Sequence, residues 1–166
     1  SCLLRRAMVA ETLEARWLLL ETVASFAQKL LKLDPTNHRA LRALGLAELV
    51  LKRYERSVPI FERCLELAPS FIAARHNFAI VLHRQNKSAR ALEQLNALMA
   101  QDPRSPTYLN LRAAILARIG DFDAALPLFE TVLATQPNHP KIWMSYGHAL
   151  KTAGRVGDCI EAYRKS

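Results

Sequence analysis

The chain has few glycines, few cysteines and no long apolar run. Only five of its 166 residues are glycine, and Ala, Leu, Arg and Glu are abundant, which is typical of all-helical proteins. No apolar segment approaches the roughly 20 residues that a transmembrane helix requires. The first residues also lack the uninterrupted apolar core of a secretory signal. The sequence therefore predicts an all-α protein without a membrane span.

The three cysteines, Cys2, Cys64 and Cys159, are far apart and form no Cys-x-x-Cys pair. This pattern predicts neither a disulfide framework nor a structural zinc site. It favours a reducing compartment, and we expect a cytoplasmic location.

Residue patterns for catalysis or metal binding are also missing. His76 and His83 are seven residues apart, whereas zinc ligation on a helix favours a spacing of four, and no carboxylate or cysteine lies beside them. No nucleophile–base pair and no phosphate-binding loop can be identified. We expect no catalytic residue, no metal and no cofactor, and we expect these histidines to be solvated.

Prolines mark an internal repeat, because Pro35, Pro69, Pro103 and Pro137 recur every 34 residues. Each period predicts a helix, a short turn, a second helix and a proline-marked turn. Three further columns keep the same spacing: a small column (Gly45, Ala79, Ala113, Gly147), a second small column (Ser57, Ala91, Ala125, Cys159) and a mostly aromatic column (Phe61, Leu95, Phe129, Tyr163).

The presence of glycine in the small column needs a physical explanation, because Gly within a helix lowers stability by roughly 0.5–1 kcal/mol relative to Ala. We predict that the two helices of each unit cross closely at Gly45 and Gly147. The second small column would face this crossing and the aromatic column would fill the space beside it.

Turn residues separate the two helices of each unit. Gly120 is predicted to end a first helix and Asp121 to cap the second helix that follows. Gly154 repeats this signal. The signal at Asn86 is weaker, although Asn can take the left-handed conformation, and Lys52 has no special turn chemistry.

The repeat resembles the tetratricopeptide repeat, a helix–turn–helix unit with Trp or Leu, Gly or Ala, Ala, Phe or Tyr, and Pro at set positions. Residues 141–166, KIWMSYGHALKTAGRVGDCIEAYRKS, carry the best match. The resemblance implies an all-α right-handed superhelix of stacked antiparallel helix pairs, with about nine helices. It divides the chain into a divergent N-terminal cap or partial repeat (1–37), three repeats (38–71, 72–105 and 106–139) and a truncated repeat (140–166).

The N-terminal segment keeps only half of the pattern. The sequence ASFAQKLLKLDP at residues 24–35 fits a second helix and its proline, but no Gly or Pro precedes it. One helix from Leu3 to Leu33 and a hairpin with an unmarked turn are both compatible with this. Because the chain begins with Ser1 and ends within a helical pattern, we expect it to be a fragment of a longer protein.

A closer resemblance is to the repeat region of bacterial tetratricopeptide-repeat sulfotransferases. The segments AARHNFAIVLHRQN, NLRAAILARIGDFDAAL and HPKIWMSYGHALKTAGR carry it. In that family a separate downstream domain performs the chemistry, and none of its residues is present in this chain. The repeats are also similar to those of O-linked N-acetylglucosamine transferase, whose asparagine ladder corresponds here to Ala43, Asn77, Leu111 and Ser145.

The tetratricopeptide resemblance implies that the first helices line a concave groove. Within each first helix, the groove residues are those on the face opposite the small column. The candidate peptide-binding groove consists of Arg39, Arg42, His76, Asn77, His83, Arg84, Asn110, Arg118, Lys141, Ser145, His148 and Lys151.

These residues include no acid, and the whole chain carries a formal net charge of +8. The pattern predicts a non-catalytic interaction module whose basic groove binds an extended acidic segment of a protein or peptide. By the closer resemblance, this module is the recognition region of a larger sulfotransferase. Nucleic acid is disfavoured, because the inner columns vary and the aromatics lie in the packing column. The alternative function is a structural scaffold that mediates self-association into a homo-oligomer. It is compatible with the sequence because the apolar residues 17–20 leave a surface that another segment must bury.

Two charged residues interrupt core columns. Arg112 stands where the other units have Leu, Phe or Tyr, and Glu48 stands where the others have Leu. Because a buried unpaired charge is costly, each is expected to find a partner or to extend to the surface.

Overall fold

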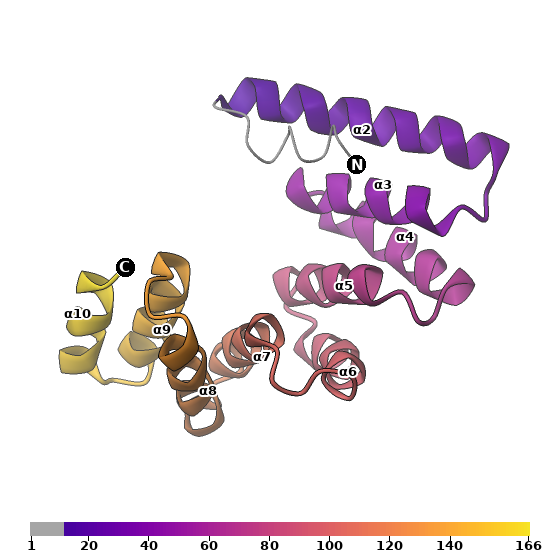
Figure 1. The fold of residues 1–166 in the computed structure, drawn as a ribbon. Coiled ribbons are helices and arrows are strands. Elements are labelled where there is room, and N and C mark those ends of the chain that lie inside the picture. Colours follow the sequence, from indigo (N-terminus) through magenta and orange to yellow (C-terminus); the bar gives the residue numbers. More distant parts are fainter. Residues whose placement is uncertain (1–11) are drawn as a thin grey trace. The chain divides into compact units, whose positions relative to one another are not determined.

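The computed structural model describes residues 12–166. All regular structure in this range is helical, which confirms the all-α prediction, and the nine described helices match the expected number (Figure 1). The helices are α2 (Leu13–Leu33), α3 (His38–Val50), α4 (Tyr54–Leu67), α5 (Ile72–Arg84), α6 (Ser88–Met99), α7 (Pro106–Arg118), α8 (Phe122–Thr135), α9 (Pro140–Thr152) and α10 (Val156–Arg164).

Helix boundaries repeat with the period of the sequence. The first helices α3, α5, α7 and α9 begin at residues 38, 72, 106 and 140, and the second helices α4, α6, α8 and α10 begin at residues 54, 88, 122 and 156. Each series advances by 34 residues. The prolines that revealed the repeat lie in the turns before the first helices.

Helix α2 begins at Leu13. Thr12 has an extended backbone (φ −110°, ψ 147°), and its side chain accepts a hydrogen bond from the Ala15 amide at 3.2 Å, as an N-cap does. The alternative of one uninterrupted helix from Leu3 to Leu33 is therefore wrong. What was expected of residues 3–11, and of Cys2, lies outside the described residues.

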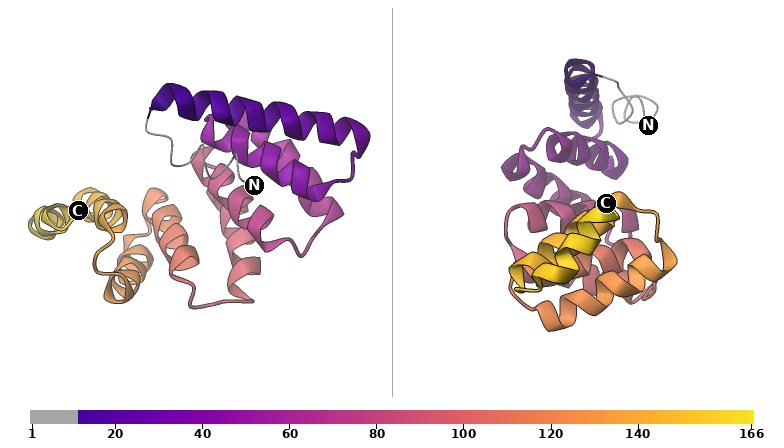
Figure 2. Two further views of the ribbon diagram at one scale, coloured as in Figure 1. Left: turned by 45° about the horizontal axis from the view of Figure 1, so that its top comes forward. Right: turned by 90° about the vertical axis from the view of Figure 1, so that its left-hand side faces the viewer.

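The described residues form two compact units, residues 12–87 with α2–α5 and residues 88–166 with α6–α10. In the first unit α3 packs between α2 and α4, and α5 contacts both α4 and α3. In the second unit α7 packs against α6 and α8, and α9 packs against α8 and α10 and also touches α7. Figure 2 shows successive helices of each unit joined by short turns.

Each unit has its own apolar core. In the first unit Leu20, Val23 and Ala27 of α2 pack against Leu44 and Ala47 of α3. In the second unit α8, α9 and α10 supply the core residues Phe129, Val132, Ile142, Leu150 and Ala162. Burial of these rows against neighbouring helices is the main source of stability in such repeats.

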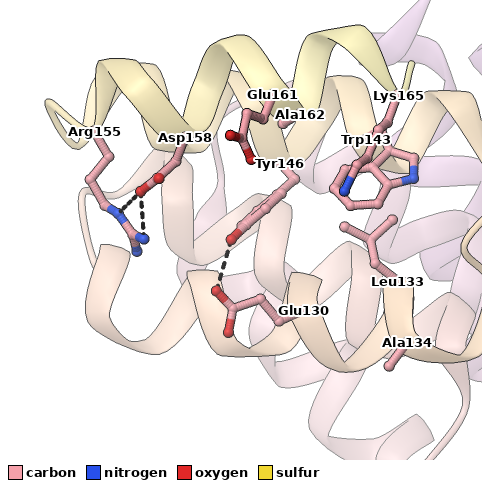
Figure 3. A pocket seen from close by; sticks show the side chains of 10 residues that line it. All are labelled: Glu130, Leu133, Ala134, Trp143, Tyr146, Arg155, Asp158, Glu161, Ala162 and Lys165. Carbon is pink, nitrogen blue, oxygen red and sulfur yellow. Dashed lines mark hydrogen bonds and ion pairs between the residues drawn. The ribbon is translucent and has the colours of Figure 1, made fainter.

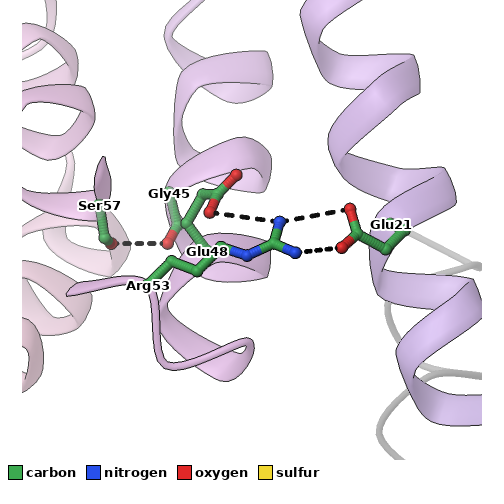
Figure 4. Close-up of polar contacts among 5 residues, drawn as sticks. All are labelled: Glu21, Gly45, Glu48, Arg53 and Ser57. Carbon is green, nitrogen blue, oxygen red and sulfur yellow. Dashed lines mark hydrogen bonds and ion pairs between the residues drawn. The ribbon is translucent and has the colours of Figure 1, made fainter. Parts of the chain in front are cut away.

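The small column lies at the helix crossings, as predicted. A Cβ atom added to Gly45 would lie 2.9 Å from Cζ of Phe61, and one added to Gly147 would lie 2.7 Å from Cε1 of Tyr163. The aromatic ring of the second helix therefore rests directly on the glycine of the first. Ser57, from the second small column, donates a hydrogen bond from its Oγ to the Gly45 carbonyl at 2.8 Å (Figure 4).

The turns inside the repeats use one left-handed residue each. Gly120 (φ 88°) and Gly154 (φ 80°) are glycines, Asn86 has φ 60°, and Lys52 has φ 61°. Asp121 then caps α8 by accepting a hydrogen bond from the Ala124 amide at 3.2 Å, as predicted. The left-handed conformation of Lys52 was not predicted, because a lysine side chain does not favour it.

Two first helices are tied to the proline turn that precedes them. Nη2 of Arg75 donates to the Pro69 carbonyl, and Nε1 of Trp143 donates to the Pro137 carbonyl, both at 2.6 Å. Arg75 and Trp143 occupy the same position of the repeat, so different side chains make the same contact. This bond fixes the start of the first helix against the preceding turn.

The buried charge at Glu48 has the partner that was expected. Its side chain is nearly inaccessible, and its Oε2 lies 3.8 Å from Nη1 of Arg53. Arg53 also forms a two-point ion pair with Glu21 of α2 (Figure 4). Arg112 is half-buried, and its Nη1 contacts the Met99 sulfur at 3.6 Å.

In the described range no helix combines the length and the apolar character that crossing a bilayer requires.

The contact between Gly147 and Tyr163 predicts a reversal of sign in a double-mutant cycle. Gly147→Ala should lower the free energy of unfolding by about 1 kcal/mol, because the added methyl collides with the ring. In a Tyr163→Leu background the same substitution should raise it by about 0.5–1 kcal/mol, the helix propensity of Ala over Gly. Urea unfolding of the four proteins measures both effects. An equal effect of Gly147→Ala in the two backgrounds would contradict the contact.

The left-handed backbone at residue 52 predicts that Lys52→Gly is stabilising. The substitution removes the steric cost of a side chain at positive φ, and we expect a gain of about 0.5–1 kcal/mol in the free energy of unfolding. Lys52→Ala removes the same charge without relieving the backbone and serves as the control. Thermal unfolding in which Ala and Gly give the same stability would show that the gain does not come from the backbone.

Candidate functional site

The predicted groove residues of the first unit come from two helices in contact, α3 and α5. Arg39 and Arg84 are exposed, whereas Arg42 and His76 are half-buried. Asn77 and His83 are buried, each with 8% of its surface accessible. The structure thus brings this set onto neighbouring helices but leaves only part of it open to a ligand. We call these residues the α3–α5 face.

Burial changes the role of the polar groups on the α3–α5 face. The guanidinium carbon of Arg42 lies 5.8 Å from the centre of the Phe71 ring, and its Nε is buried. Burial lowers the pKa of His76 below its ordinary value, which favours the neutral ring. The expectation of solvated histidines is therefore wrong for His83 and only partly right for His76.

The second unit presents a comparable set on α7 and α9, which also touch each other. Arg118, Lys141, His148 and Lys151 are exposed, and Asn110 and Ser145 are half-buried. We call these six residues the α7–α9 face.

Two polar groups on the α7–α9 face already have partners within the chain. Oγ of Ser145 donates to the Lys141 carbonyl at 3.0 Å, and Nδ1 of His148 lies 2.9 Å from the Tyr163 hydroxyl. Arg118, Lys141 and Lys151 are the exposed cationic side chains of this face.

In the described residues, acidic and basic side chains are distributed differently between the first and the second helices of the repeats. The one acid within α3, α5, α7 and α9 is the buried Glu48. Exposed acids of the repeats lie on the second helices or in the turns beside them: Glu55, Glu66, Glu93, Asp123, Glu130, Asp158 and Glu161 are on second helices, and Asp102 and Asp121 are in turns. The first-helix faces are therefore positive wherever they meet solvent.

The chemistry that these faces support is binding. Within the described residues no group of three or more His, Cys, Asp or Glu side chains could hold a metal ion. Burial raises the pKa of the Cys64 thiol, whose Sγ lies 3.2 Å from the His38 carbonyl, so a reactive thiolate is disfavoured. Exposed guanidinium and ammonium groups can donate charge-assisted hydrogen bonds to carboxylates.

A second site, which the sequence did not reveal, is a hollow of about 430 Å³ bounded by α8, α9 and α10 (Figure 3). Trp143 and Tyr146 of α9 form its aromatic part. The repeat pattern alone cannot show that neighbouring helices leave one side of Trp143 uncovered. The remaining lining residues are Glu130, Leu133, Ala134, Arg155, Asp158, Glu161, Ala162 and Lys165.

Two polar contacts fix the walls of this hollow. The Tyr146 hydroxyl donates to Oε1 of Glu130 at 2.7 Å, and Arg155 pairs with Asp158 at 2.6 Å (Figure 3). Burial, followed by the hydrogen bond to Glu130, raises the pKa of Tyr146 to about 12. The phenol therefore remains protonated near neutral pH and keeps donating to the carboxylate.

Comparison with known families identifies the repeat. Three tetratricopeptide-repeat models match residues 23–70, 49–115 and 106–149, and together they cover the chain from residue 23 to residue 149.

Two named relatives are similar to parts of the chain. The small glutamine-rich tetratricopeptide repeat-containing protein 2 of Mycosarcoma maydis is 33% identical over 75 residues, which is 45% of this chain and 21% of that protein. ER membrane protein complex subunit 2 of Xenopus tropicalis is 25% identical over 141 residues, 85% of this chain and 47% of that protein. The chain thus spans from about a fifth to about half of the length of these relatives.

Solved structures give the same fold. A fragment of MamA from Desulfovibrio magneticus RS-1 superposes with a TM-score of 0.77 at 18% identity, covering 89% of this chain and 83% of that one. YrrB, described as a TPR protein with an unusual peptide-binding site, superposes with a TM-score of 0.69 at 20% identity, covering 98% and 82%. Residues 23–149 of this chain are tetratricopeptide repeats, and the whole described part has the fold of tetratricopeptide-repeat proteins.

Proposed function

We propose that the chain is a non-catalytic binding module whose first-helix faces recognise an extended acidic segment of a protein or peptide. Tetratricopeptide-repeat proteins mediate protein–protein interaction, so the general class follows from the family. The observation that carries the finer proposal is the sign of the exposed charge. In the described range, the titratable side chains that α3, α5, α7 and α9 expose are arginine, lysine or histidine, and none of them is acidic.

Exposed arginines and lysines supply the direct contacts in this proposal. Arg39 and Arg84 on the α3–α5 face, and Arg118, Lys141 and Lys151 on the α7–α9 face, are open to solvent. Each can pair with a ligand carboxylate, and guanidinium groups can do so through two parallel hydrogen bonds. Because such contacts are at the surface, salt should weaken binding.

The half-buried and buried residues of the two faces could offer further hydrogen bonds to a ligand. Arg42 stacks near Phe71, and its buried Nε has no hydrogen-bond partner among the described residues. Nδ2 of Asn77 and Oδ1 of Asn110 are also buried and also lack a hydrogen-bond partner among the described residues. A ligand that reached these groups would satisfy them, since an unpaired buried polar atom costs about 1–3 kcal/mol.

Within a longer protein, we propose that the module presents its ligand to a catalytic domain elsewhere in that protein. The sulfotransferase form of this proposal depends on the sequence resemblance of the three repeat segments quoted above. A bacterial setting depends on the same resemblance, and a cytoplasmic one depends on the cysteine pattern.

Self-association is the second candidate function, and one observation favours it. Helix α2 exposes large apolar side chains, with Leu18 71% and Leu33 85% accessible. Trp17 and Phe26 are also about half accessible, at 48% and 58%. Such a helix can pack against a second copy of the chain.

Titration with hexaglutamate tests the proposal. Arg84→Glu should weaken binding about tenfold, because one attractive surface contact becomes repulsive. Arg56→Glu makes the same charge change at an exposed position of the second helix α4 and should alter affinity much less. Isothermal titration calorimetry at low and high salt measures both.

Equal weakening by the two substitutions would show that only net charge matters and would contradict recognition by the first-helix faces. A molecular mass that rises with concentration, unchanged by either substitution, would favour self-association instead.

A further inference from the structure

We propose that the hollow bounded by α8, α9 and α10 binds a cationic side chain, lysine or arginine, of a basic peptide segment. This site is separate from the first-helix faces and has the opposite ligand preference. It lies entirely within the second unit, and the contacts that define it all come from residues 130–165.

The aromatic part of the hollow suits a cation. The Trp143 and Tyr146 rings lie 6.1 Å apart between centroids and are inclined by 59°, so they form two sides of a corner. An ammonium or guanidinium group held within about 6 Å of such a ring is attracted by its electron-rich face. Nζ of Lys165 already lies 4.7 Å from the centre of the Trp143 ring. The structure therefore shows that an ammonium group fits at this position.

The carboxylates around the rings add charge of the right sign. Glu130, Asp158 and Glu161 line the hollow together with two cations, Arg155 and Lys165. Arg155 is already paired with Asp158, and Glu130 accepts the Tyr146 hydroxyl. Among the described contacts no hydrogen bond or ion pair engages Glu161 (Figure 3). Its carboxylate is available to an incoming cation above the rings.

The balance of charge around the hollow differs from that of the chain as a whole. Three acids and two bases line the hollow, whereas the whole chain has a formal net charge of +8. The apolar residues Leu133 and Ala162 complete the wall and can contact the methylene stem of a long basic side chain. A ligand lysine or arginine would displace Lys165 from Trp143 and pair with Glu161.

A titration of the isotopically labelled chain with tetralysine, followed by NMR, tests the site. The indole N–H signal of Trp143 should shift and saturate. Glu161→Gln should weaken this binding about two- to fivefold, because one exposed ion pair is lost. Lys165→Ala should strengthen it by a similar factor, because the competing ammonium is removed. Glu93→Gln, an exposed position of α6 outside the hollow, makes the same charge change as Glu161→Gln and should have little effect.

Three outcomes would overturn the inference: no saturable shift of Trp143, equal weakening by Glu93→Gln and Glu161→Gln, or a Trp143 shift that follows protein concentration without peptide. The last result would show that a second copy of the chain fills the hollow. None of them bears on hexaglutamate binding, so this inference and the proposed function can fail independently.

Discussion

The structure depends on the close approach of an aromatic ring to a glycine inside a helix. Phe61 rests on Gly45 and Tyr163 rests on Gly147, at distances that leave no room for a Cβ atom. The cost of glycine in a helix is offset by ring burial and by dispersion over the whole contact. This contact holds the second helix against the first in each of these repeats. It also sets which face of the first helix is left for a ligand.

The distribution of charge follows from that arrangement. Once the small column is buried, part of the opposite side of each first helix still meets solvent, and the charged side chains exposed there are cationic. The second helices carry most of the exposed acids of the repeats, and three of these acids line the hollow beside α10 together with Trp143 and Tyr146. Under the two proposals, a chain with a net positive charge offers one surface for acidic segments and another for basic side chains.

The period of the sequence predicted much of the fold, because helix starts, the small columns and the cap at Asp121 are local features that recur. The conformation of Lys52 was missed, because position in the turn, and not side-chain preference, imposes its positive φ. The burial of Asn77 and His83 was also missed, because first-helix residues can be covered by neighbours that no column identifies. The hollow depends on the distance between two helices, which periodicity does not specify.

Chemical-shift mapping of the labelled chain with hexaglutamate tests the central claim most directly. The account predicts that the perturbed amides cluster in α3, α5, α7 and α9, and that added salt reverses the shifts. Perturbations centred on α4, α8 and α10, or spread evenly over both helix classes, would contradict it.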